Sequence, residues 1–103
     1  MNGFYILAVQ ARLDIDEITG FVAAKNVEAG VRLLDKFIDK FETLAKFPNI
    51  GRRRDDLAPR LRSLPVEEYL IFYQPVEGGV QIARVVSGYR DLDTLFSEQD
   101  ESW

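Results

Sequence analysis

The spacing of hydrophobic residues changes several times along the chain, and each change predicts a secondary-structure element. Five consecutive aliphatic or aromatic residues at 69–73 predict a strand that is buried on both faces. Pro75 has no backbone N–H to donate to a ladder, so we expect this strand to end there. A Gly-containing segment at 77–79 and a β-branched run at 80–86 complete the pattern of a β-hairpin. We expect this hairpin to form the centre of the core.

The first half of the chain combines one strand pattern with two helical patterns. Residues 4–8 form a short apolar run that is typical of a buried strand. Between residues 11 and 22, apolar side chains recur every three or four positions, and the same spacing returns from 34 to 45. Pro48 then ends the second helix, because the residue before a proline disfavours helical dihedrals. Few residues separate the two helices, so we expect an antiparallel helix hairpin whose apolar faces pack on the sheet.

Polar residues and one glycine refine these two helices. Asp14, Asp16 and Glu17 fall off the apolar stripe of the first helix, early enough for their negative charge to complement the helix dipole. Gly20 weakens the prediction that this helix is continuous. Asn26 is of a type that caps helix N-termini well, so we expect the second helix to begin there.

The remaining segments complete the expected architecture. Residues 52–59 are predicted to form a charged loop, and residues 60–66 alternate as in a more exposed strand. Pro65 indicates that this strand lies at a sheet edge or carries a bulge. The order of strand, two helices, three antiparallel strands and a short helix at 92–96 predicts an α+β fold with a mainly antiparallel sheet.

Composition limits the possible classes of protein. The 103 residues, 47% of them apolar, suit a single domain, which we place at 1–96, followed by an acidic flexible tail at 97–103. The absence of cysteine and histidine excludes thiolate chemistry, Ser/His/Asp triads and nearly all zinc sites, so we expect no cofactor and no metal. We find no transmembrane run and no signal peptide, and therefore expect a cytoplasmic protein with no membrane partner. The net charge of −4 argues against direct sequence-specific binding to nucleic acid.

Four segments together resemble the ParE/RelE superfamily, the toxins of type II toxin–antitoxin modules, and most closely its ParE branch. Residues 11–18 (ARLDIDEI) are similar to the A-x-x-D-L-x-x-I helix start of that superfamily, and residues 44–51 to its L-x-x-x-P-x-x-G helix exit. Residues 69–73 (YLIFY) resemble its Y-x-I-x-Y strand, and residues 88–96 its terminal G-x-R-D-x-x-x-x-F signature. The resemblance implies the compact toxin fold and a hetero-oligomer with a cognate, ParD-like antitoxin.

The resemblance leaves more than one target open. In the ParE branch the target is DNA gyrase, whereas RelE-type toxins cut mRNA in the ribosomal A site. RelE-type nucleases have an arginine where Leu70 stands and a tyrosine where Phe96 stands, and neither residue of this chain can stabilise a phosphate or exchange a proton. We therefore interpret the chain as a non-enzymatic gyrase inhibitor. An inactive relative that only binds an antitoxin is a further alternative.

Two groups of residues are candidates for partner contacts. Tyr89, Arg90, Asp91 and Trp103 are the candidates for binding the target, although Asp91 would also suit a helix cap that leaves Arg90 to pair with a carboxylate.

Phe37, Phe41, Arg60 and Arg62 are the candidates for binding the antitoxin. The two arginines, predicted on one face of an edge strand, would serve equally to deter aggregation. The run Arg52-Arg53-Arg54 is followed at once by Asp55 and Asp56, which favours a solvated loop over a site for an anionic target.

Overall fold

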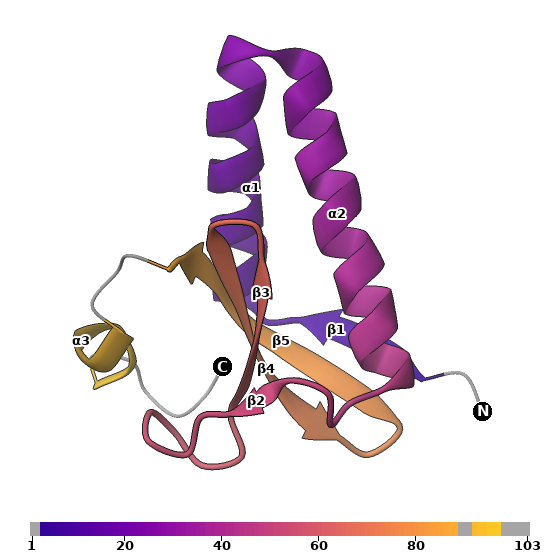
Figure 1. Ribbon diagram of the computed structural model, residues 1–103, viewed down its shortest axis with the longest axis vertical. Helices are drawn as coiled ribbons and strands as arrows, with labels where there is room; N and C mark the ends of the chain where they lie inside the picture. Colours follow the sequence, from indigo (N-terminus) through magenta and orange to yellow (C-terminus); the bar gives the residue numbers. More distant parts are fainter. Residues whose placement is uncertain (1–2, 89–91, 98–103) are drawn as a thin grey trace.

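A computed structural model describes residues 3–88 and 92–97 (Figure 1). Within these residues the elements follow in the order β1 (Phe4–Leu7), α1 (Val9–Lys25), α2 (Val27–Lys46), β2 (Arg52–Arg53), β3 (Arg62–Val66), β4 (Tyr69–Val76), β5 (Gly79–Ser87) and α3 (Leu92–Ser97). This order confirms the predicted α+β fold. Neither long helix, nor α3, has the length and apolar content to cross a membrane.

The five strands form one mixed sheet in the order β1-β5-β4-β3-β2. β1 runs parallel to β5, and the other neighbouring strands are antiparallel. The expected charged loop is shorter than predicted, because Arg52 and Arg53 pair with Ser63 and Arg62 as the two-residue strand β2. Charged side chains on an edge strand can point to solvent while the backbone pairs with the next strand. The arginines therefore gave no strand pattern in the sequence, and β2 was not predicted.

The β4–β5 hairpin is the centre of the sheet, as predicted. β4 continues past Pro75 to Val76, one residue further than expected. The pairing of β3 with β4 ends at Tyr73, so Pro75 has a neighbouring strand on the β5 side only, where a proline is better tolerated. Glu77 and Gly78 make the turn, with Gly78 in the left-handed region at φ +83°.

Hydrophobic clusters cover both faces of the sheet, which confirms the prediction that β4 is buried on both sides. The helix hairpin packs on one face and buries a cluster that includes Phe37, Phe41, Ile71 and Tyr73. The other face is covered by the loop before β3 and by α3. Its cluster contains Leu61, Phe72, Ala83, Val86 and Phe96, with Leu57, Ala58, Leu70, Leu92 and Leu95 packed against it.

The two long helices form the predicted antiparallel hairpin. Asn26 caps α2, since its side-chain Oδ1 accepts a hydrogen bond of 3.1 Å from the amide of Ala29. α1 begins at Val9 and passes through Gly20 without a break. Gly30 allows the helices to approach closely, because a Cβ at this position would lie 2.6 Å from the Cβ of Ala23.

Asp14 falls off the predicted apolar stripe, yet the structure buries it, and it does not lie in the first turn of α1, where the dipole argument expected an acidic residue. It is buried at 8% exposure and binds the guanidinium of Arg84 through two hydrogen bonds of 2.7 and 3.0 Å. The amide of Val85 also donates to Asp14 at 3.0 Å. β1 pairs with β5 only as far as Ile82, so the carboxylate of Asp14 takes the place of a strand carbonyl beyond the end of β1.

Candidate functional site

One candidate surface is an apolar hollow between the helix hairpin and β1, which we call the helix groove. It has a volume of about 210 Å³ and is lined by Tyr5, Leu7, Arg12, Ile15, Asp16, Leu34, Ile38 and Phe41. β1 beside it was predicted to be a buried strand, but it is an outer strand of the sheet and exposes Phe4, Ile6 and Leu7. An open strand edge beside an apolar hollow suits an extended or helical segment of a partner.

The structure places Phe37 and Phe41, predicted as antitoxin contacts, in the core. Their exposed fractions are 0% and 1%, and Tyr5 packs on Phe41 with ring centroids 5.4 Å apart. Phe41 closes the floor of the helix groove, and the accessible apolar side chains there include Leu7, Leu34 and Ile38. The helical period predicted the apolar stripe correctly, but it could not separate the residues that face the sheet from those at its margin.

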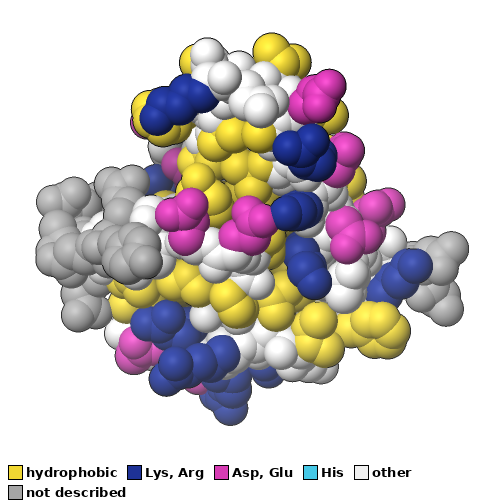
Figure 2. All heavy atoms as spheres, turned by 45° about the horizontal axis from the view of Figure 1, so that its top comes forward, with side chains coloured by type: hydrophobic (Ala, Val, Ile, Leu, Met, Phe, Trp, Pro, Cys, Tyr) yellow, Lys and Arg dark blue, Asp and Glu magenta, His cyan; other side chains and the backbone are white. Residues whose placement is uncertain are grey.

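The closed end of the helix hairpin exposes further apolar side chains. Phe21 is 66% and Val27 69% exposed, and the ammonium group of Lys25 lies 4.6 Å from the ring centroid of Phe21. In Figure 1 this end projects beyond the sheet, and Figure 2 shows hydrophobic side chains on the surface of the hairpin. The sheet therefore covers only part of the apolar surface of the two helices, whereas the sequence predicted that their apolar faces pack on the sheet.

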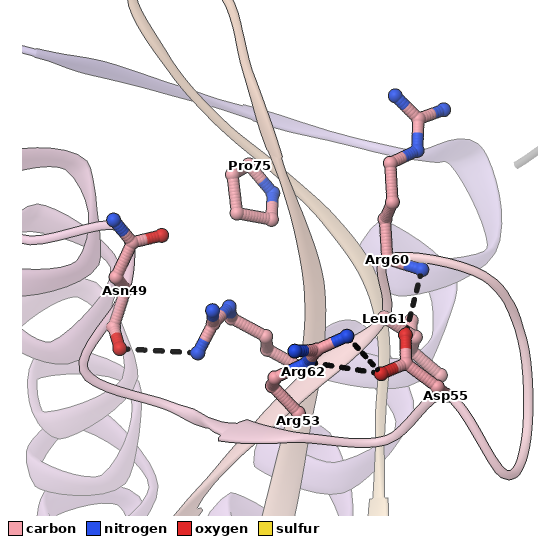
Figure 3. A pocket seen from close by; sticks show the side chains of 7 residues that line it. All are labelled: Asn49, Arg53, Asp55, Arg60, Leu61, Arg62 and Pro75. Carbon is pink, nitrogen blue, oxygen red and sulfur yellow. Dashed lines mark hydrogen bonds and ion pairs between the residues drawn. The ribbon is translucent and has the colours of Figure 1, made fainter.

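A second candidate surface lies at the opposite edge of the sheet, which we call the arginine hollow (Figure 3). Its volume is about 190 Å³, and it is lined by Asn49, Arg53, Asp55, Arg60, Leu61, Arg62 and Pro75. Figure 2 shows Lys and Arg side chains gathered at the end of the molecule where Figure 1 places β2.

The arginines of this hollow are held in different ways. Arg62 donates from Nη1 to the backbone carbonyls of Asn49 and Gly51, at 3.1 and 2.8 Å. Arg53 forms an ion pair of 2.7 Å with Asp55. Arg60 lies before β3, not in it, and has a positive φ of 62°. The predicted strand start at residue 60, and the shared face of Arg60 and Arg62 on that strand, are therefore wrong.

Tyr73 fixes the loop to which Arg62 is bound. Its hydroxyl accepts a hydrogen bond of 2.8 Å from the amide of Gly51 and donates one of 2.8 Å to the carbonyl of Pro48. Burial raises the pKa of Tyr73, and the Gly51 amide and the charge of Arg62 oppose this shift. The buried, neutral phenol thus anchors one wall of the arginine hollow.

The acidic residues after the arginine run neutralise two of its members. Asp55 pairs with Arg53, and Asp56 pairs with Arg54 at 3.2 Å. The hydrogen bond from Arg54 lowers the pKa of Asp56. The run is nevertheless not the expected solvated loop, because Arg52 and Arg53 form β2 and Arg54 lies 5.8 Å from the ring centroid of Phe72.

The positions that distinguish RelE-type nucleases lie on the sheet face opposite the helices. Leu70 packs against the apolar cluster there, and Phe96 is buried within it. The rings of Phe96 and Phe72 meet edge to face at 4.8 Å. Both positions therefore serve packing on this face.

The predicted target contacts fall outside the part of the chain that the structure describes. These residues are Tyr89, Arg90, Asp91 and Trp103. The described elements on either side of the first three are β5, which ends at Ser87, and α3.

Comparisons with known proteins agree with this architecture. Residues 5–92 match the family described as "ParE toxin of type II toxin-antitoxin system, parDE". The chain is 31% identical over 80 residues to Toxin ParE3 of Caulobacter vibrioides, an alignment that covers 77% of this chain and 80% of that protein. Its fold is similar to that of a chain from the chromosomal ParDE TA system of P. aeruginosa, with a TM-score of 0.70 and 18% identity over 84% of this chain and 96% of that chain. The family match covers most of the chain, and the chain therefore belongs to the ParE toxin family of type II toxin–antitoxin systems.

Proposed function

We propose that this protein is a toxin that arrests growth by binding DNA gyrase and that a cognate ParD-like antitoxin neutralises it. The observation that carries the proposal is the ParE family match over residues 5–92. In this account the toxin blocks the supercoiling cycle through protein contacts in the cytoplasm and catalyses no reaction.

The antitoxin is proposed to bind in the helix groove. Leu34 and Ile38 supply accessible apolar contacts, and Arg12 and Asp16 add polar ones. An amphipathic helix placed there would leave the open edge of β1 for an extended continuation of the same partner. A stable complex of this kind buries on the order of 1,600 Å² in total, so the contact extends beyond the groove itself.

Co-purification from the native operon tests this placement. Leu34→Arg puts a charge into the groove and is expected to abolish recovery of the antitoxin with the tagged toxin. Val27→Arg, at the exposed end of the helix hairpin, is the matched control and should leave recovery unchanged. Recovery of the wild-type chain alone and soluble from the operon would count against an antitoxin partner.

The absence of RNA cleavage is proposed from the residues on the second sheet face. Leu70 and Phe96 stand where RelE-type nucleases carry an arginine and a tyrosine, and both pack into an apolar cluster. Purified toxin added to translating ribosomes should leave the mRNA intact in primer extension. Codon-specific cleavage that disappears in Arg90→Ala would support the nuclease alternative instead.

The contacts with gyrase are proposed to come from the C-terminal segment, through Tyr89, Arg90, Asp91 and Trp103. Residues 89–91 come shortly after β5 in the sequence, and Phe96 packs α3 on the sheet. Functional residues are commonly displayed in this way at the end of a rigid element.

Two variants test this segment. Truncation after Phe96 and Arg90→Ala should each fold and each inhibit gyrase supercoiling less than the wild type. If both variants fold and inhibit at wild-type concentrations, the segment does not contact gyrase. If even the wild-type chain neither arrests growth nor inhibits gyrase, it is an inactive relative that only binds an antitoxin.

A further inference from the structure

We propose that the arginine hollow is a binding site for an acidic peptide segment of a protein partner, in which Arg60 and Arg62 bind neighbouring carboxylates. This site lies at the sheet edge opposite the helix groove. With four strand spacings of about 4.8 Å between them, β1 and β2 are about 19 Å apart, so a short helix in the groove does not fill the hollow. The proposal holds whether or not gyrase is the target.

The hollow carries more positive than negative side chains. Three guanidinium groups line it together with one carboxylate, that of Asp55. Asp55 accepts both from Nε of Arg53, at 2.9 Å, and from its Nη2, at 2.7 Å, so it compensates that arginine. Two positive charges remain, in a protein whose net charge is −4.

The guanidinium of Arg62 is held in one position, but its positive charge is not compensated by a carboxylate among the described residues. Its Nη1 donates to two backbone carbonyls, which fix the guanidinium but carry no net charge. An arginine has five N–H donors, so the planar group keeps donors for a further acceptor. Because the side chain is already ordered, less conformational entropy is lost when a carboxylate binds.

Arg60 is the other arginine of the hollow whose charge is not compensated among the described residues. It has a positive φ of 62°, a conformation that glycine or asparagine adopts more easily than arginine. Its guanidinium makes no ion pair or side-chain hydrogen bond with the described residues, and Figure 3 shows it extending away from Asp55. An uncompensated charge on a strained backbone position points to a role in binding.

The geometry favours a peptide over a nucleic acid. The hollow is small, at about 190 Å³, and Leu61 and Pro75 give it an apolar part that a side-chain methylene can contact. Its two uncompensated guanidinium groups can bind a few carboxylates, whereas nucleic-acid binding depends on neutralising a longer row of phosphates. Arginine binds carboxylates through paired N–H donors, as Arg53 already does with Asp55.

Fluorescence anisotropy with the full chain tests the site. The probes are a labelled hexaglutamate peptide and a labelled hexathymidylate oligonucleotide. We expect the peptide to bind with an affinity that falls as salt rises, and the oligonucleotide to bind more weakly. Arg60→Asn keeps a residue that tolerates the left-handed region, and it should weaken peptide binding about tenfold through the loss of charged hydrogen bonds.

Arg32→Gln is the matched control. It removes the same charge from an exposed position on α2, where Arg32 lies 3.8 Å from the carboxylate of Glu28, and should leave the affinity unchanged. The proposal is overturned if the wild-type chain does not bind the peptide, or if Arg60→Asn binds it as tightly as the wild type. Preferential binding of the oligonucleotide would also overturn it, because the hollow would then be a nucleic-acid site.

Discussion

At the scale of single residues, the ion pair between Asp14 and Arg84 is the contact whose loss should cost the most stability. Both side chains are almost fully buried, and the carboxylate also accepts from the amide of Val85. Two buried charges are stable in this setting because they hydrogen-bond to each other, and no buried side-chain polar atom in the described residues lacks a partner. The pair joins α1 to the free edge of β5.

Removing one member of this pair should destabilise the protein strongly. Asp14→Ala leaves the Arg84 charge buried and uncompensated, and we expect the free energy of unfolding to fall by about 3–5 kcal/mol. Urea unfolding followed by circular dichroism measures the change. Arg32→Gln breaks only an exposed pair, so it should change stability by less than about 1 kcal/mol. Equal effects of the two substitutions would contradict the assigned role of Asp14.

Tyr73 allows a prediction about alkaline stability. At neutral pH, Tyr73→Phe leaves the Gly51 amide without its acceptor and should destabilise the protein by about 1–3 kcal/mol. Since the folded pKa of Tyr73 is raised, its contribution is fully present below the unfolded pKa of about 10. It is lost as pH rises above that value, because the unfolded chain then releases a proton that the folded chain keeps.

The wild type should therefore lose more stability than Tyr73→Phe between about pH 9 and 11. Unfolding midpoints in urea across this range measure the difference. Tyr69→Phe is the control at neutral pH, since the Tyr69 hydroxyl makes no hydrogen bond with the described residues, and it should be nearly neutral there. Parallel pH profiles for the wild type and Tyr73→Phe would show that Tyr73 does not titrate as proposed.

Single contacts of this kind were the part of the structure least accessible from the sequence. Asp14 falls off the apolar stripe of its helix, and its partner Arg84 is 70 residues away, so no local pattern links them. The same holds for the contact between Tyr73 and Gly51, which depends on how the loop after α2 returns to the sheet. The sequence predicted Arg60 and Arg62 as partner contacts, but on one face of a strand and not in the hollow where the structure places them.

At the scale of elements, the helix hairpin depends on how closely its two helices approach. Gly30 of α2 lies against Ala23 of α1, whereas a Cβ at Gly20 of α1 would meet no atom of a neighbouring element within 4 Å. The same substitution at the two glycines therefore separates helix propensity from helix packing.

Gly20→Ala should raise the free energy of unfolding by about 0.5–1 kcal/mol, because alanine has the higher helix propensity and the site is open. Gly30→Ala should lower it by about 1–3 kcal/mol, since the new methyl group would push against the backbone of Ala23. Urea midpoints of both variants give the comparison. A stabilising effect at both positions would mean that the helices are not in close contact at Gly30.

Most elements followed from local patterns, for a physical reason. The long helices and the β4–β5 hairpin each bury a regular face, and such a face imposes its period on the sequence. β2 was not predicted because two exposed arginines carry no such period. The strand end at Pro75 was predicted one residue too early, because a proline is tolerated where the neighbouring strand β3 has already ended.

At the scale of the whole molecule, the helix groove and the arginine hollow lie at opposite edges of one sheet. If they serve separate contacts, Leu34→Arg should abolish antitoxin binding and leave hexaglutamate binding unchanged, and Arg60→Asn should weaken only the binding of the peptide. Co-purification and fluorescence anisotropy on the same two variants measure both effects. Loss of both activities in Leu34→Arg, in a variant that still folds, would show that the two surfaces form one site.

The central proposal is that this member of the ParE toxin family acts on gyrase by binding and not by cutting RNA. The most direct measurement adds the purified full-length chain, in the same concentration series, to a DNA gyrase supercoiling reaction and to translating ribosomes. We predict that supercoiling is inhibited and that the mRNA remains intact. Undiminished supercoiling together with cleaved mRNA would contradict the proposal.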